Sequence, residues 1–236
     1  MQGLKMTRPE MFGIFHCSAA LLCLLIGYFG GRYLAKREEK LQTEIIFRCG
    51  LFLLSLELFK QFLLYSDGQP HPEAFPLQLC STPLYLCLAY PFLKEKDSVK
   101  TYFATFILIA ALAALIYPED MLKEEVFLTL QSFLWHGILV FLAVWGFFTM
   151  GRDSFPGAVK IFLGFALLAF LANILFHQLW PERVIDLFYI SPYTVTLQPV
   201  FHEIAERYGE LPETFIYLLS ILSGAYGIFY IKKRSA

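Results

Sequence analysis

The hydrophobic positions of this chain fall into seven long apolar runs separated by short polar segments. The runs cover about 11–31, 44–65, 75–93, 101–118, 126–150, 155–177 and 213–231. Each approaches the roughly 20 apolar residues that a helix needs to cross the hydrocarbon core of a bilayer. The pattern predicts an all-α fold, a polytopic membrane bundle of seven transmembrane helices, with residues 1–236 as one integral membrane domain. The one long connection, 180–212, is predicted to be an outer loop or lid with an interfacial helix.

Composition supports the membrane assignment and excludes several classes of function. The chain is 57% hydrophobic and 17% charged, against roughly 45–50% apolar and about 25% charged residues in soluble proteins. Its net charge of -1 leaves no basic patch, so nucleic acid is not expected as a partner. The five cysteines lack the CxxC spacing that would indicate a zinc site or a redox pair.

The distribution of Lys and Arg predicts the orientation in the membrane, because cytoplasmic loops hold the excess of both residues. If the amino terminus is outside and the carboxyl terminus cytoplasmic, 12 of these residues lie inside and 5 outside. The inner set is Arg32, Lys36, Arg37, Lys40, Lys94, Lys96, Lys100, Arg152, Lys160, Lys232, Lys233 and Arg234, and the outer set is Lys5, Arg8, Lys123, Arg183 and Arg207. We expect a multi-pass protein of the cell membrane, of a bacterial plasma membrane in particular. The oligomeric state stays open.

The third apolar run carries an unusual cysteine. In FPLQLCSTPLYL (75–86), the polar residues Gln78, Ser81 and Thr82 surround Cys80, although unsatisfied polar groups cost several kcal/mol in hydrocarbon. Pro83 removes one backbone hydrogen bond, so a kink or a local opening of the helix is predicted there. The alternative is a Pro-kinked membrane helix with an inert thiol.

Other polar residues fall in the outer halves of their runs when the chain is oriented in this way. They predict a shared pocket that opens toward the outer leaflet. A structural ion pair between Glu57 and Lys60 is the alternative for that part of the set, and a metal site at the three histidines stays open. The set comprises His16, Glu57, Lys60, Gln131, Ser132, His136, Asn173 and His177.

A cysteine and a histidine in one pocket can carry out acyl transfer without a cofactor. The histidine takes the thiol proton, and the thiolate attacks an ester carbonyl to give a thioester. His136 is the preferred base for Cys80, with His16 and His177 as competitors. Candidates for binding the oxyanion are Gln78, Ser81, Thr82 and Asn173, and Glu57 or Asn173 could orient the imidazole.

Two further interpretations belong to other classes of protein. A small-solute transporter would bind its solute at the outward-facing pocket, at Glu57, Lys60, His16 and His177, but carriers of this type are built from repeats with matching interrupted helices. The only interrupted helix predicted here is the one at Pro83. A non-enzymatic scaffold would use the same polar groups for hydrogen bonds between its helices.

Two motifs resemble the YwaF/transmembrane protein 164 family of multi-spanning membrane proteins. They are FPLQLC at 75–80 and, some fifty residues later, the Trp-His-Gly of SFLWHGILV at 132–140. The resemblance implies a membrane-embedded acyltransferase that acts on glycerophospholipids, with Cys80 as the nucleophile and His136 as its histidine. It also implies a phospholipid or lysophospholipid substrate taken from the bilayer. A lipid esterase with the same dyad is the related alternative.

Overall fold

The computed structural model describes residues 6–65 and 68–235, and this part of the chain contains helices and no strands. Lys5, which was counted for the orientation, lies outside the described residues. The α-helices are α1 (Ile14–Leu34), α2 (Glu39–Leu64), α3 (Thr82–Ala89), α4 (Lys96–Tyr102), α5 (Leu108–Ile116), α6 (Val126–Thr149), α7 (Phe155–Leu179), α8 (Phe201–Tyr208) and α9 (Glu210–Ser235). Short 3-10 turns are η2 (Pro72–Ala74), η3 (Leu79–Ser81), η4 (Tyr90–Phe92) and η6 (Leu187–Tyr189), and η5 (Phe103–Ile107) is a π-helix.

Five helices are long and apolar enough to cross a membrane. They are Ile14–Leu34, Lys96–Ile116, Val126–Thr149, Phe155–Leu179 and Glu210–Arg234. The segment Leu79–Phe92 is apolar but shorter, and α2 has the length but contains several charged residues. The all-helical membrane fold predicted from the sequence is therefore confirmed, whereas crossing by α2 and by Leu79–Phe92 stays a prediction.

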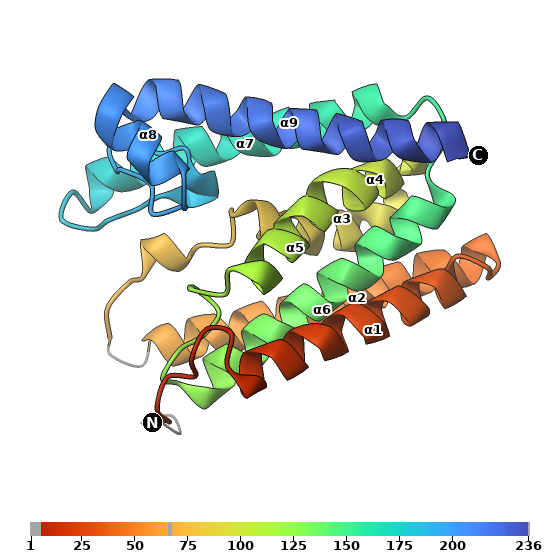
Figure 1. Cartoon of the computed structure of the whole chain (residues 1–236), viewed down its shortest axis with the longest axis horizontal. Helices are drawn as coiled ribbons and strands as arrows, with labels where there is room; N and C mark the ends of the chain where they lie inside the picture. The colour runs from red at the N-terminus through yellow and green to blue at the C-terminus, as the bar shows by residue number, and fades with distance from the viewer. Residues whose placement is uncertain (1–5, 66–67, 236) are drawn as a thin grey trace.

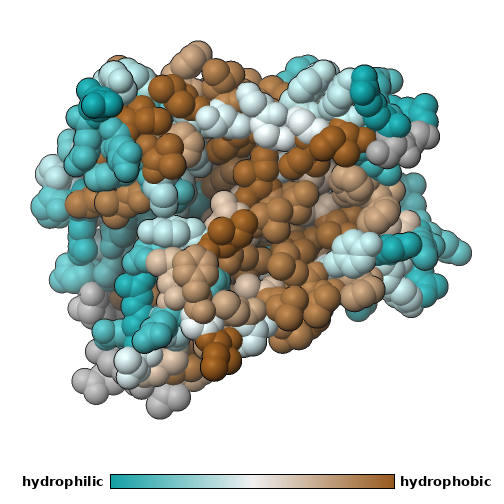
Figure 2. All heavy atoms as spheres, viewed as in Figure 1, coloured by the Kyte–Doolittle hydropathy of each residue, from teal (hydrophilic) through white to brown (hydrophobic). Residues whose placement is uncertain are grey.

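Successive long segments run in alternate directions between the two ends of the molecule (Figure 1). The helix α1 packs along α6, α2 contacts α3, α4 contacts α7, and α8 lies against α9. The loops that contain η2 and η6 lie at the end where α8 is found (Figure 1). Apolar surface covers the middle of the face shown in Figure 2, with hydrophilic surface at its two ends. This distribution suits a bilayer around the middle of the bundle.

Glycines allow α1 to approach α6 closely. A side chain at Gly31 would place its Cβ 2.6 Å from the carbonyl oxygen of Phe141, and one at Gly27 would meet Val140 at 2.6 Å. Gly27 and Gly31 are four residues apart, which is the GxxxG spacing that brings membrane helices into backbone contact. Here the motif joins two helices of the same chain.

The third apolar run does not form the continuous helix predicted for 75–93. Its backbone is irregular up to Gln78, turns once as η3, and becomes α-helical only at Thr82. Pro83 lies in the first turn of α3, where the missing N–H has no helical partner to lose, so proline begins this helix instead of kinking it. The carbonyl of Leu79, which would accept the missing N–H of Pro83 in a continuous helix, accepts the Thr82 hydroxyl at 2.8 Å.

Candidate functional site

Cys80 lies in a non-helical turn whose backbone carbonyls are satisfied by side chains. Such backbone is tolerated at membrane depth only where protein surrounds it, because unpaired carbonyls are costly in hydrocarbon. The donors are Lys60 and Gln61 to Ala74 (3.0 Å each), Tyr85 to Pro76 (2.9 Å), Thr82 to Leu79 (2.8 Å) and Trp135 to Cys80 (2.9 Å). The turn is thus fixed from α2, α3 and α6 together, and its half-buried thiol has the Ser81 side chain as its hydrogen-bonding neighbour.

The Trp-His-Gly of α6 places three consecutive residues in three environments. Trp135 reaches the Cys80 carbonyl. Gly137 faces α1, where an added Cβ would lie 3.3 Å from the sulfur of Cys23. His136 lies between them, about 100° around the helix from each, and is buried. The three residues therefore join α6 to the Cys80 turn and to α1.

The hydrogen bond of His136 fixes its tautomer. Its Nδ1 lies 2.8 Å from the carbonyl oxygen of Ser132, and a carbonyl only accepts, so Nδ1 carries the proton. The neutral ring therefore has an unprotonated Nε2, the atom that a general base needs. Within the described residues no hydrogen bond joins His136 to Cys80, so their two elements are linked through Trp135.

Two side-chain amides hold the loop that follows α7 onto the bundle. Gln78 donates through Nε2 to the carbonyl of Asp186 (2.9 Å), and its Oε1 accepts from the backbone N–H of Phe188 (2.8 Å). Asn173 makes the same pair of bonds with both backbone groups of Leu187, at 2.9 and 2.8 Å. The amide groups expected to bind an oxyanion are thus committed to η6, and they place this loop beside the Cys80 turn.

A buried carboxyl lies in the same loop. Asp186 accepts the backbone N–H of Ser191 at 3.0 Å through Oδ1, whereas its buried Oδ2 has no hydrogen bond within the described part of the chain. Burial raises the pKa of Asp186 to about 6. The cause is the loss of water around the charged form, which the hydrogen bonds only partly offset.

The structural ion pair that the sequence left as an alternative is present near the carboxyl end of α2. Lys60 Nζ lies 2.9 Å from Glu57 Oε1, and Gln61 donates to the same oxygen at 2.7 Å. Glu57 is buried, and Lys60 and Gln61 both bind the carbonyl of Ala74. The group therefore anchors the segment that leads to Cys80. Glu57 does not orient His136, which is held by the carbonyl of Ser132.

The remaining predicted pocket residues have separate partners. His16 accepts the N–H of Phe12 at 3.0 Å and lies 2.8 Å from the Leu115 carbonyl, which ties α1 to the end of α5. His177 stacks on Tyr193 with ring centroids 4.0 Å apart. Gln131 and Ser132 contact each other at 3.5 Å. No group of three or more His, Cys, Asp or Glu side chains in the described ranges could hold a metal ion.

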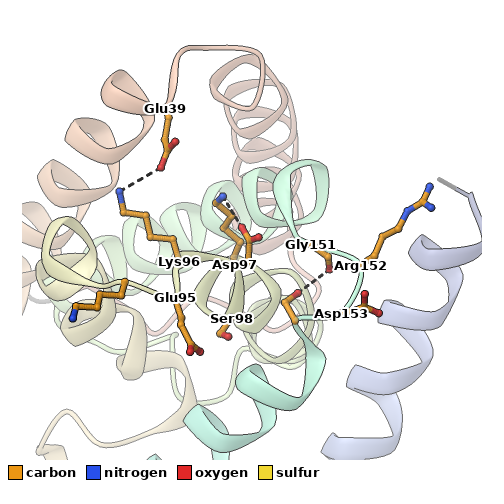
Figure 3. Close-up of a pocket in the computed structure, with 11 residues that line it drawn as sticks. Glu39, Glu95, Lys96, Asp97, Ser98, Gly151, Arg152 and Asp153 are labelled. Carbon is orange, nitrogen blue, oxygen red and sulfur yellow. Dashed lines mark hydrogen bonds and ion pairs between the residues drawn. The ribbon is translucent and has the colours of Figure 1, made fainter.

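A hollow of about 570 Å³ lies at the opposite end of the α3 segment from Cys80. It is lined by charged side chains of the loops around Lys94 and Arg152. Figure 3 shows Lys96 directed at Glu39, 3.5 Å away, and Lys100 is paired with Asp97 at 2.8 Å. These pairs hold the loops at this end of the bundle together. The hollow is therefore distinct from the Cys80 site.

Sequence reasoning did not identify the tyrosines around Cys80. Tyr102 is fully buried and lies 2.8 Å from the Thr82 hydroxyl, and a Cys80 thiolate would act electrostatically on Tyr102, Tyr189 and Tyr217. With 13 tyrosines in the chain, no spacing sets these three apart. The π-helix that follows Tyr102 is a feature often found at functional sites, but the apolar sequence gives no signal for it.

Comparison with known proteins gives one match that covers nearly the whole chain. The model of the TMEM164 family matches residues 8–230. No curated protein matches the sequence. No solved structure matches it either.

Proposed function

The chain belongs to the TMEM164 family, and on that premise we propose that it is a membrane-embedded acyltransferase that moves a fatty acyl chain between glycerophospholipids. The observation that carries the proposal is the Cys80 turn. Its half-buried thiol lies in the apolar bundle on a backbone fixed by side chains, one of them the neighbour of His136. A structural cysteine has no need of such support, whereas a nucleophile does.

In the proposed mechanism, His136 Nε2 takes the proton of the Cys80 thiol and the thiolate sulfur attacks the ester carbonyl of a phospholipid. The carbon–sulfur bond forms and the ester C–O bond breaks, and the imidazolium returns its proton to the departing glycerol oxygen. The hydroxyl of a lysophospholipid then attacks the thioester with His136 again taking the proton, the carbon–sulfur bond breaks, and the imidazolium returns its proton to the Cys80 sulfur. Water in place of that hydroxyl would make the protein an esterase.

The reaction needs the imidazole to come within hydrogen-bonding reach of the thiol. Catalytic hydrogen bonds are often long in enzymes without substrate and tighten when the substrate binds. The contact of Trp135 with Cys80 keeps the two elements in register, and the Nδ1–H of His136 is already bound to Ser132.

We also propose seven membrane crossings with the amino terminus outside, in a bacterial plasma membrane. The alternating direction of the segments supports this topology (Figure 1). It places the Cys80 turn and the loop 180–212 toward the outer leaflet, which would supply the substrate.

The deciding experiment uses the purified full chain in vesicles that contain phosphatidylglycerol with a radiolabelled acyl chain and unlabelled lysophosphatidylethanolamine, so that transfer gives labelled phosphatidylethanolamine. We expect the wild type to transfer label to the lysophospholipid. Cys80→Ala should abolish transfer, and His136→Ala should lower it by about 10²-fold or more. Label bound to the wild-type protein and released by hydroxylamine would identify the thioester. Full turnover by Cys80→Ala would overturn the mechanism.

A further inference from the structure

We propose that the hydroxyl groups of Tyr189 and Tyr217 bind the oxyanion that forms when Cys80 attacks the ester carbonyl. The inference rests on the proposed function and deepens it. Acyl transfer needs hydrogen-bond donors at the developing negative charge, and the amides of Gln78 and Asn173 already donate to the outer loop. The Thr82 hydroxyl donates to the carbonyl of Leu79, so of the four side chains predicted to bind the oxyanion only Ser81 is uncommitted, and further donors are needed.

The backbone at Tyr189 is held in an unfavourable conformation. Phe188 and Tyr189 have φ of 63° and 58°, in the left-handed region that bulky side chains rarely adopt. The pair persists because Gln78 binds the N–H of Phe188 and Asn173 binds Leu187. Strain of this kind gathers at functional sites, and here the residue that holds it, Gln78, is two positions from the nucleophile.

The strained turn brings Tyr189 to Tyr217 of α9. The two rings meet edge to face with centroids 6.3 Å apart, and Phe201 packs on Tyr217 from the other side at 5.1 Å. Gln78, two residues before Cys80, binds the backbone of Phe188, the neighbour of Tyr189. A loop residue and a helix residue that are distant in sequence thus lie together beside the turn that carries the nucleophile.

Both hydroxyl protons are available for donation. Tyr217 is 6% exposed, and its hydroxyl makes no hydrogen bond to the residues described. Burial raises the pKa of Tyr189, so its phenol stays protonated at neutral pH. Gln198 is its hydrogen-bonding neighbour, and an amide N–H donated to the phenol oxygen leaves the phenol proton free.

Tyr102, the third phenol near Cys80, does not have a free proton. The Thr82 hydroxyl gives its single hydrogen to the carbonyl of Leu79 at 2.8 Å. Tyr102 must therefore be the donor in its 2.8 Å bond with Thr82. This assignment separates Tyr102, which supports the turn, from the two tyrosines that face the reaction.

The test compares Tyr189→Phe, Tyr217→Phe and the double variant of the full chain in detergent, with p-nitrophenyl palmitate as the acyl donor. Each single variant should lower kcat by about 10²-fold, with little change in KM. Alkylation of Cys80 by iodoacetamide is a displacement that forms no oxyanion, so its rate should not change. Tyr226→Phe, an exposed tyrosine on the same helix, is the control and should keep full activity.

The possible outcomes distinguish a failure of this inference from a failure of the proposed acyl transfer through Cys80. If Cys80→Ala keeps its turnover, the proposed thioester mechanism fails. If Cys80→Ala is inactive while the double tyrosine variant acylates within twofold of the wild type, the oxyanion assignment alone fails. A parallel loss of alkylation and acylation would also overturn it, because the tyrosines would then position the thiol.

Discussion

The indole nitrogen of Trp135 donates a hydrogen bond to the backbone carbonyl of Cys80 over 2.9 Å. This bond joins the helix that carries His136 to the turn that carries the thiol. Trp145, ten residues later on α6, makes a bond of the same length to Gln42 Oε1 in the half of the bundle away from the Cys80 turn. One helix thus provides a matched pair of buried indole hydrogen bonds, of which only the first contacts the Cys80 turn.

The pair predicts that stability and activity can be separated. Both Trp135→Phe and Trp145→Phe remove a buried hydrogen bond and should destabilise the fold by about 1–3 kcal/mol. Thermal unfolding in detergent measures this loss. Acyl transfer, measured below the unfolding transition, should fall only in Trp135→Phe, because the Cys80 turn loses its link to α6. Equal activities in the two variants would show that this link has no catalytic role.

The two hydrogen bonds that Gln78 makes to the backbone of Asp186 and Phe188 predict how strongly the loop is protected from hydrogen exchange. Gln78→Glu removes the donor to Asp186 and places a carboxylate oxygen against that carbonyl. Hydrogen–deuterium exchange in 185–191 should become faster, since the bond to Phe188 alone cannot hold the loop. Gln61→Glu is the control, because Gln61 binds Ala74 instead, and it should loosen 71–76. Unchanged exchange at 185–191 in Gln78→Glu would show that the hydrogen bonds of Gln78 do not hold the loop.

Asp186 predicts a pH dependence of stability. Its pKa is raised by burial from 3.8 to about 6, so the folded state prefers the protonated carboxyl. This preference contributes stability below about pH 4 that is lost as the pH rises through 6, up to about 3 kcal/mol. Thr196 and Ser191 bind the carboxyl, and Glu213, Tyr189 and Tyr217 face it.

Asp186→Asn removes this contribution together with the effect of the Asp186 charge on Glu213, and the groups distant from Asp186 titrate equally in both proteins. The free energy of unfolding of the wild type should fall relative to the variant between pH 4 and 7, as measured by thermal or denaturant unfolding in detergent. Above pH 7 the variant should be the more stable protein. Parallel pH profiles would mean that the Asp186 carboxyl titrates normally.

The parts of the fold that the sequence predicted are those set by apolar length and composition. Ranges such as 126–150 and 155–177 differ from α6 and α7 by at most two residues. The start of α3 was predicted too early, because hydropathy cannot distinguish an apolar helix from an apolar non-helical segment. The segment before Cys80 is non-helical because side chains from three helices donate hydrogen bonds to its carbonyls, among them Lys60 and Trp135.

The candidate site likewise contains residues that the sequence could predict and contacts that it could not. Cys80 and His136 stand out in the sequence because polar groups in apolar runs are rare. The partners of Gln78 and Asn173 could not be predicted, because an amide in an apolar run looks the same in the sequence whether it binds substrate or the backbone of a loop. The positive φ of Phe188 and Tyr189 is likewise a consequence of tertiary contacts, as neither residue type favours that conformation.

The contact between α1 and α6 predicts an unequal response to two identical substitutions. Gly31→Ala would place a Cβ 2.6 Å from the Phe141 carbonyl oxygen and 2.9 Å from the Trp145 nitrogen. Both atoms belong to the backbone, so the helices must separate at a cost of about 1–3 kcal/mol. Gly164→Ala meets no atom within 4 Å and should stabilise α7 by about 0.5–1 kcal/mol. Melting temperatures that shift in the same direction would refute close packing at Gly31.

The proposed topology predicts which introduced thiols are reached from outside the cell. Lys123 and Lys94 lie in loops at opposite ends of the bundle (Figure 1), and both side chains are accessible to water. A membrane-impermeant maleimide should label Lys123→Cys in intact cells and Lys94→Cys only after permeabilisation, with peptide mapping to exclude the native cysteines. Because an odd number of crossings separates the two ends of the chain, a thiol appended after Ala236 should behave like Lys94→Cys. The reverse pattern would place the Cys80 turn toward the cytoplasmic leaflet, and labelling of both loops in intact cells would contradict the membrane crossings between them.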